Sequence, residues 1–222
     1  MELRSYLNVY WCIPLKENAV FVARMEDILD VYEMSYDPRC PVLCMDEKPY
    51  QLLGETKEPL PMRPGDTQKT DSEYARKGTC SIFVFTEPLA GWRHIAVRKQ
   101  RQATDWAEEI RYLLDECYPG YEKVILVMDN LNIHAEASLY KRYKPDEARR
   151  LAKRLEIYHT PVHGSWLNIA EIELNAMTRQ CFAYRIDYLE DLNRELRVWE
   201  QECNAETRTV NWHFKLGDVV RN

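Results

Sequence analysis

One stretch of the chain joins an unbroken apolar run to a polar tail. Residues 124–128 are all apolar, Asp129 follows directly, and the sequence Asn-Leu-Asn-Ile-His134 comes next. A short apolar run rich in β-branched residues predicts a strand buried on both faces, as the strands of parallel sheets are. Because open α/β sheets place their chemistry at the carboxyl ends of strands, Asp129 is a candidate functional residue. Aspartate also favours turns, so Asp129 could equally do no more than end the strand.

A second stretch repeats this pattern nearer the N-terminus. Residues 42–45 form a short apolar run, and Asp46 follows it directly, with Glu47 and Lys48 next. Two buried strands that each end in an aspartate would bring the two carboxylates together if the strands are neighbours in the sheet.

The remaining hydrophobic pattern predicts alternating helices and strands. Helices are predicted at residues 17–34, after a Thr104 cap, in a basic segment broken near Pro145, at residues 165–177 and at residues 189–202. Residues 80–85 and 94–97 predict an antiparallel pair of strands, and residues 155–159 a short edge strand. Residues 54–77, rich in proline and charge, predict a long loop.

The order of these elements defines the fold class. Strand, hairpin, helix, strand, helix, strand, helix gives an α/β protein with a mixed five-stranded sheet flanked by helices, in the manner of an RNase H-like domain. A chain of 222 residues can bury one full core. We expect a helical lead-in at residues 1–40, one RNase H-like domain at residues 41–205 and a truncated C-terminal tail at residues 206–222.

Composition indicates a globular protein of the reducing cytoplasm. Apolar residues make up 45% of the chain and charged residues 30%, and no run is long enough to span a bilayer. The chain does not begin with a secretory signal. Its seven scattered cysteines include no Cys-x-x-Cys pair, which argues against a disulfide framework or a zinc site.

The charge distribution bears on a nucleic-acid partner. The net charge of −6 argues mildly against one, because phosphate binding usually leaves a basic footprint. Two clusters soften that conclusion. They are Arg93, Arg98, Lys99 and Arg101, and the seven basic residues between Lys141 and Arg154. Such clusters could be phosphate-facing patches, although runs of charge are more often solvated surface.

The carboxylates at the ends of the two apolar runs predict a metal site. Like charges placed together repel, and a divalent ion is the usual compensation. Hard oxygen ligands favour Mg²⁺ or Mn²⁺, and two such ions about 4 Å apart can hold both oxygens of a phosphodiester displacement. The helix predicted from Ser165 offers Glu171 or Glu173 as a third carboxylate. Asn168 and Glu171 also fit a capping box, and Glu171 can serve both roles.

Three blocks of sequence in this order resemble a known family. They are Met45-Asp46-Glu-Lys48, Met128-Asp129-Asn-Leu-Asn-Ile-His134 and His163-Gly-Ser-Trp-Leu-Asn-Ile-Ala-Glu171. Together they resemble the DDE catalytic domain of bacterial insertion-sequence transposases, in the branch related to the mariner-like elements of animals. Pro88-Leu-Ala-Gly-Trp-Arg-His94 and Ala137-Ser-Leu-Tyr140 are also typical of the bacterial branch. The resemblance extends from about Trp11 to Trp212.

The resemblance implies an RNase H-like fold in which Asp46, Asp129 and Glu171 are the catalytic residues and the metal ligands. It implies cut-and-paste DNA transposition with two Mg²⁺ (or Mn²⁺) ions. Element ends are cleaved by hydrolysis, and the freed 3′-hydroxyl then attacks target DNA, commonly at TA. The partner would be DNA, bound by a homodimer in the bacterial cytoplasm at the nucleoid, with no membrane involved.

Two departures from the family pattern qualify this expectation. Forty-one residues separate Asp129 from Glu171, more than in the animal relatives. No helix-turn-helix region precedes the predicted domain, and the chain stops soon after residue 214. We therefore expect a catalytic domain alone.

Four further residues are candidate DNA contacts. His134 could hold Asp129 or touch DNA, and a structural hydrogen bond explains it equally well. Lys48 could meet a phosphate or pair with a carboxylate, and the pairing is favoured. His163 and Trp166 lie beside the third carboxylate, where an aromatic ring could stack on a displaced base. Packing at the helix start is the better explanation of Trp166.

Two other functions stay open at this stage. One is a catalytically idle fragment that binds and modulates a full-length transposase, which the acidic charge and the absent helix-turn-helix motivate. The other is a nuclease of the same fold without strand transfer. Product analysis separates that nuclease from a transposase, because only strand transfer joins donor DNA to target DNA.

Overall fold

The protein folds around a five-stranded sheet in the order β3-β2-β1-β4-β5. The computed structural model describes residues 19–58, 60–61, 64–65, 69, 71–130 and 134–214. The strands are β1 Val42–Glu55, β2 Tyr74–Glu87, β3 Trp92–Arg98, β4 Val124–Met128 and β5 Leu155–His159. β2 is antiparallel to both β1 and β3, whereas β4 is parallel to both β1 and β5. The predicted mixed sheet is therefore confirmed, with β5 at an edge.

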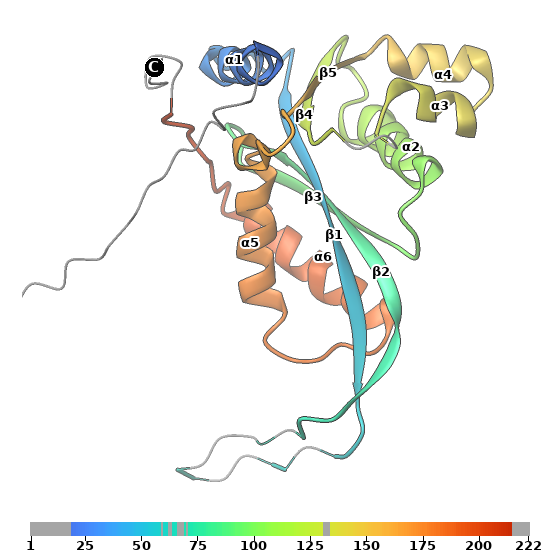
Figure 1. Ribbon diagram of the computed structural model, residues 1–222, viewed down its shortest axis with the longest axis vertical. Helices are drawn as coiled ribbons and strands as arrows, with labels where there is room; N and C mark the ends of the chain where they lie inside the picture. Colours follow the sequence, from blue (N-terminus) through green and yellow to red (C-terminus); the bar gives the residue numbers. More distant parts are fainter. Residues whose placement is uncertain are drawn as a thin grey trace, which may run out of the picture.

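Helices cover both faces of this sheet (Figure 1). One face carries α1 Ala19–Glu33, α5 Ala170–Cys181 and α6 Leu189–Ala205. The other carries α2 Ala103–Tyr112, the π-helical turn Leu113–Cys117, α3 Glu136–Arg142 and α4 Pro145–Ala152. Alternate residues of β4 enter the two helical layers, as Leu126 and Val127 illustrate. Burial on both faces is why β4 is apolar throughout.

β1 does not end at Asp46, and that part of the prediction is wrong. Residues 42–45 pair with β4, and from Asp46 onward β1 pairs with β2 alone as far as Glu55. Asp46 therefore lies inside a strand, at the point where β4 leaves the sheet. Pro49 is tolerated there because β1 has one neighbour only, so a missing N–H does not interrupt a central ladder.

The connection between β1 and β2 is shorter than the predicted loop, because residues 54–55 and 74–77 belong to the strands. Arg185 fixes the base of this hairpin. Its guanidinium donates to Glu55 Oε2 at 2.6 Å and to the carbonyl oxygens of Asp71 and Glu73 at 2.8 and 2.9 Å. Figure 1 shows this end of β1 and β2 reaching beyond the helices.

Several helix boundaries differ from the prediction. Gln102, not Thr104, is the N-cap of α2, and its N–H donates to Asp105 Oδ2 at 2.8 Å. The helix predicted from Ser165 starts as a 3₁₀ turn, and α5 itself begins at Ala170. The break at Pro145 is confirmed, since that residue starts α4. Residues 17–18 of the first predicted helix, like Trp11, lie outside the described residues.

α6 covers the outer edge of β3 with side chains that replace a neighbouring strand. Asn204 accepts a hydrogen bond from the Arg93 N–H at 2.7 Å and donates to the Arg93 carbonyl at 2.8 Å. Glu200 accepts the N–H of Ile95 at 2.9 Å. The edge strand thus has backbone partners although no sixth strand is present among the described residues.

His94 on β3 lies between the carboxylates of Glu109 on α2 and Glu200 on α6, each 3.5 Å from a ring nitrogen. Burial lowers the pKa of His94, but the hydrogen bonds and charges of Glu109 and Glu200 outweigh it and raise the pKa to about 9. The charged ring is therefore favoured in the folded state.

This raised pKa predicts a pH-dependent stability. The folded pKa lies above the unfolded value of about 6.5, so the contribution is fully present below about pH 6.5 and is lost as the pH rises through about 9. We expect His94→Gln to lower the free energy of unfolding by up to about 3 kcal/mol near pH 6 and by much less near pH 10. Urea unfolding at both pH values measures this. A pH-independent difference would contradict it.

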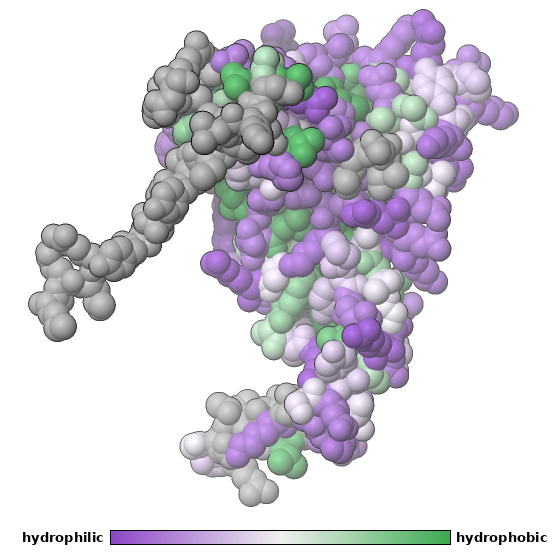
Figure 2. Space-filling view, in the orientation of Figure 1, coloured by the Kyte–Doolittle hydropathy of each residue, from purple (hydrophilic) through white to green (hydrophobic). Residues whose placement is uncertain are grey.

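The face of the molecule in Figure 2 is mostly hydrophilic. Within the part of the chain that the structure describes, no helix has both the length and the apolar character needed to cross a membrane.

Candidate active site

Asp46, Asp129 and Glu171 line one polar cavity of about 440 Å³. Asp46 comes from β1, Asp129 directly follows β4, and Glu171 lies in the first turn of α5. The parallel pairing of β1 and β4 ends at Met45 and Met128, so the two aspartates leave the ladder side by side. α5 packs against β1 and adds the third carboxylate from the same face of the sheet.

The carboxyl group of Asp46 is electrostatically unusual. Burial raises the pKa of Asp46 to about 7, and the charges of Asp129 and Glu171 contribute to the rise. The N–H of Glu47 opposes it by donating to Asp46 Oδ1 at 2.7 Å. A carboxyl group with so high a pKa, in a cavity shared with like charges, marks a candidate acid–base or cation-binding site.

Asp129 lies beside His134. The Nδ1 atom of His134 lies 3.3 Å from Asp129 Oδ1, and its Nε2 atom lies 3.3 Å from Glu47 Oε2. The ring is fully buried, so the alternative that His134 touches DNA directly is wrong. Glu47 was not singled out in the sequence, where its only signal is its place beside Asp46.

Asn168 ties the start of α5 to β1. Its Nδ2 donates to the Met45 carbonyl at 2.8 Å, and its Oδ1 accepts the N–H of Ala170 at 3.1 Å. The predicted capping box is wrong, because Ile169 is the N-cap of α5 and the N–H of Asn168 donates to the Ser165 carbonyl. The two Asn168 groups that a capping box would use, the side-chain oxygen and the backbone N–H, bind the Ala170 N–H and the Ser165 carbonyl instead.

Removing the Asn168 side chain should destabilise this junction. In Asn168→Ala, a buried carbonyl and a buried N–H lose their partners, so we expect the free energy of unfolding to fall by about 2–3 kcal/mol. Asn175→Ala is the matched control, because Asn175 lines the same cavity from the exposed face of α5. It should change stability by less than about 0.5 kcal/mol in the same urea titration. Equal losses in both variants would contradict the role of Asn168.

The remaining candidates differ in position. Lys48 lines the cavity, and its Nζ donates to Thr178 Oγ1 at 2.8 Å, so the favoured carboxylate pairing is wrong. His163 is exposed and does not belong to the cavity lining. The Trp166 ring meets the Phe214 ring edge-on, with centroids 5.7 Å apart, which confirms the packing role.

The donor set suits a hard divalent cation, since it consists of carboxylate oxygens only. The high pKa of Asp46 shows that a positive charge in the cavity would be favoured. The three carboxylates face one cavity without converging on one point: among the described residues, no three His, Cys, Asp or Glu side chains are close enough to hold an ion. Closer approach would have to accompany ion binding.

Several arginines of the two basic clusters are engaged in ion pairs, which favours solvated surface over phosphate-facing patches as the interpretation of the clusters. The partners are Glu173 for Arg93, Glu108 and Glu109 for Arg98, Glu47 for Arg101, Glu108 for Arg142, and Asp115 for Arg150 and Arg154. Apart from Glu108 and Glu109, which lie 10 and 11 residues after Arg98, these acidic residues are distant in sequence from their partners. The clusters therefore balance charge on the protein surface and within it.

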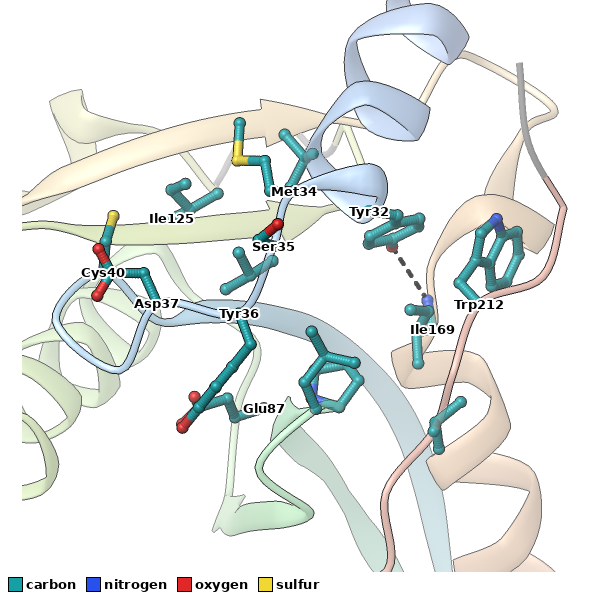
Figure 3. A pocket seen from close by; sticks show the side chains of 15 residues that line it. Tyr32, Met34, Ser35, Tyr36, Asp37, Cys40, Glu87, Ile125, Ile169 and Trp212 are labelled. Carbon is teal, nitrogen blue, oxygen red and sulfur yellow. Dashed lines mark hydrogen bonds between the residues drawn. The ribbon is translucent and has the colours of Figure 1, made fainter. Parts of the chain in front are cut away.

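A second cavity, of about 290 Å³, lies beside the segment that leads into α5 (Figure 3). Its lining is mostly apolar and includes none of the three carboxylates. The Tyr32 hydroxyl borders it, donating to the Leu167 carbonyl at 2.7 Å and accepting the N–H of Ile169 at 3.5 Å. Burial raises the pKa of Tyr32 well above its ordinary value, so the hydroxyl stays protonated. Tyr32 thus fixes residues 167–169, which lead into α5.

A match to a known protein family covers most of the chain. Residues 41–193, more than two thirds of the chain, match the DDE superfamily endonucleases. The chain belongs to this family. No curated protein matches the sequence.

Solved structures agree on the fold. The domain is similar to the Mos1 mariner paired-end complex with Mn, with a TM-score of 0.57 and 15% identity over 93% of this chain and 63% of that chain. It is also similar to the Mos1 strand transfer complex, with a TM-score of 0.56 and 14% identity over 96% of this chain and 68% of that chain. The catalytic domain of Mos1 mariner transposase gives a TM-score of 0.52 and 14% identity over 90% of this chain and 99% of that domain. The RNase H-like fold is thereby confirmed, and the chain spans less than two thirds of the first of these relatives.

Proposed function

We propose that this DDE domain is the catalytic part of a transposase that cleaves DNA at element ends and joins the freed 3′-end to target DNA. The observation that carries the proposal is the meeting of Asp46, Asp129 and Glu171 at one cavity inside the matched region. Support also comes from the similar Mos1 structures, whose descriptions name paired-end and strand-transfer complexes. The bacterial branch and binding to the nucleoid follow from the sequence resemblance.

The proposed metal ligands are Asp46, Asp129 and Glu171. Similar Mos1 complexes are described with Mn and with Mg, which supports a divalent ion. Two ions of this kind, held by these three carboxylates, would supply Lewis-acid activation of the attacking water or 3′-hydroxyl and stabilisation of the leaving oxygen.

Residues of the chain position the proposed ligands and offer a contact for DNA. Asp46 is part of β1, Asp129 directly follows β4, and the first turn of α5 presents Glu171. The Nζ of Lys48, held by Thr178 at the cavity, can approach a phosphate as its alternative partner. A homodimer bound to two element ends is part of the proposal, in line with paired-end complexes.

A cleavage and joining assay tests this function. Purified protein is incubated with supercoiled plasmid and with pre-cut linear DNA, in Mg²⁺ or Mn²⁺ and in EDTA. The proposal expects metal-dependent nicks that leave 3′-hydroxyl ends, and products in which donor DNA is joined to target DNA. Cleavage without joining would identify a nuclease instead. The absence of both reactions, together with inhibition of an intact transposase, would identify the modulating fragment.

A further inference from the structure

We propose that His134, held in place by Glu47, is a positioning residue that fixes the carboxylate of Asp129 at the cavity. The inference rests on the proposed function, because it assigns a partner to one of the proposed metal ligands. It starts from a histidine that the cavity lining does not include.

The His134 ring is fixed in the helical layer that contains α2. None of its surface is exposed. The ring stacks on Trp106 of α2, with centroids 6.0 Å apart and planes at 24°, and lies 6.4 Å from Phe83 of β2. Both aromatic residues are themselves fully buried. Packing of this density restricts the ring to one orientation.

The two ring nitrogens of His134 point to two different carboxylates. Nδ1 is at hydrogen-bonding distance from Asp129 Oδ1, and Nε2 faces Glu47 Oε2, each at 3.3 Å. The Asp129 side chain keeps 29% of its surface exposed, so it is reached from the cavity as well as from the ring. One end of this contact is therefore buried and rigid, and the other end is open to the site.

Glu47 holds the far side of the ring. Successive residues of a strand face opposite sides of the sheet, so Asp46 faces α5 while Glu47 enters the layer that contains His134. The Glu47 side chain is 2% exposed, and the guanidinium of Arg101 lies 3.0 Å from its Oε1. The carboxylate of Glu47 lies within ion-pair distance of Arg101 and His134, but neither contact has the alignment of a hydrogen bond. Glu47 therefore acts on its neighbours through its negative charge.

The result is a row of contacts, Arg101, Glu47, His134 and Asp129, that runs from the surface to the cavity. A buried carboxylate such as Glu47 is costly unless compensated on both sides, and the row supplies that compensation. The same arrangement holds the Nδ1 atom of His134 against Asp129. Groups that hold a metal-ligating carboxylate in this way typically change metal affinity about 10–100-fold when removed.

Two amide variants separate the two ends of the ring. Asparagine at position 134 places an N–H donor close to the position of Nδ1, toward Asp129, and loses the reach to Glu47. Glutamine places its amide close to Nε2 and loses the donor toward Asp129. We expect His134→Gln to weaken Mn²⁺ binding about 10–100-fold in calorimetric titrations with Mn²⁺ alone, and His134→Asn to stay within about threefold of the wild type.

His94→Gln is the matched control, because His94 is also a buried histidine between two carboxylates but lies outside the cavity. It should lose stability and leave Mn²⁺ affinity unchanged. The proposal would be overturned if both position-134 variants bound Mn²⁺ with the same affinity, whether at the wild-type value or below it. It would also be overturned if His94→Gln lost as much Mn²⁺ affinity as His134→Gln. The proposed function fails if the wild type does not bind Mn²⁺, or if Asp129→Asn does not abolish that binding. The positioning role then fails with it.

A metal-free measurement tests the contacts themselves. In ¹⁵N-labelled protein kept in EDTA, Asp129→Asn should move the resonance of the His134 Nδ1 atom, and Glu47→Gln should move that of Nε2. If neither resonance moves, the ring does not bridge the two carboxylates and the proposal is overturned.

Discussion

Asp129→Asn is expected to lower the rate of metal-dependent DNA cleavage by about 10³-fold or more. The substitution keeps the shape of the side chain and removes a charged oxygen ligand, and metal ions supply several kcal/mol of transition-state stabilisation. Asp46→Asn and Glu171→Gln should have the same effect. Glu156→Gln on β5 is the matched control, because Glu156 is a half-exposed carboxylate that lines no part of the cavity. Retained cleavage in any one variant would remove that residue from the proposed triad.

The same variants separate activity from folding. The folded pKa of Asp46 is about 7, above its unfolded value, so the folded state binds this proton more tightly and loses stability as the pH rises from about 4 through 7. Asp46→Asn removes that loss. Measured in EDTA, its stability relative to the wild type should therefore increase over this pH range, by a few kcal/mol. A variant that is inactive because it is unfolded would instead be far less stable than the wild type at every pH in this range.

Separating Arg93 from Glu173 is expected to have the largest effect on stability. The two side chains are 3% and 4% exposed, and the guanidinium donates to both carboxylate oxygens at 2.6 and 2.8 Å. Arg93 also donates to the carbonyl oxygens of Gly91 and Arg208, so it joins β3, α5 and the segment after α6. Arg93→Met should lower the free energy of unfolding by about 3–5 kcal/mol, because Glu173 is left buried without a counter-charge.

A double variant and a surface pair serve as controls. Arg93→Met with Glu173→Met leaves no lone charge and should recover part of the lost stability. Arg194→Met breaks an exposed ion pair within one helix and should cost less than about 1 kcal/mol. Guanidinium titrations of the four proteins measure these differences. A loss in Arg93→Met no larger than that in Arg194→Met would contradict the structural role of the buried pair.

The parts of the fold that sequence could predict are those defined by local pattern. β4 is an unbroken apolar run because both of its faces are buried, and Asp129 follows it directly. The three carboxylates were identified because they lie beside such patterns or match the motif of a family. The order of strands and helices then sufficed to predict the mixed sheet.

The errors concern contacts between residues far apart in the chain. β1 continues past Asp46 because β2 pairs with it, and polar residues there show no strand pattern. α5 begins at Ala170, after a 3₁₀ turn, and the Asn168 amide in front of it donates to Met45, 123 residues away in sequence. Arg101 looked like a free cation because Glu47, its partner, lies 54 residues earlier. No local pattern contains that information.

The cover that α6 provides over β3 has a consequence for association. An uncovered edge strand is a template on which a second chain can add a strand, and this is a common start of aggregation. Here Asn204 and Glu200 already occupy backbone groups of β3. α6 therefore protects this border of the sheet against self-assembly, and detachment of that helix would expose the backbone groups of β3 together with the core residues that α6 covers.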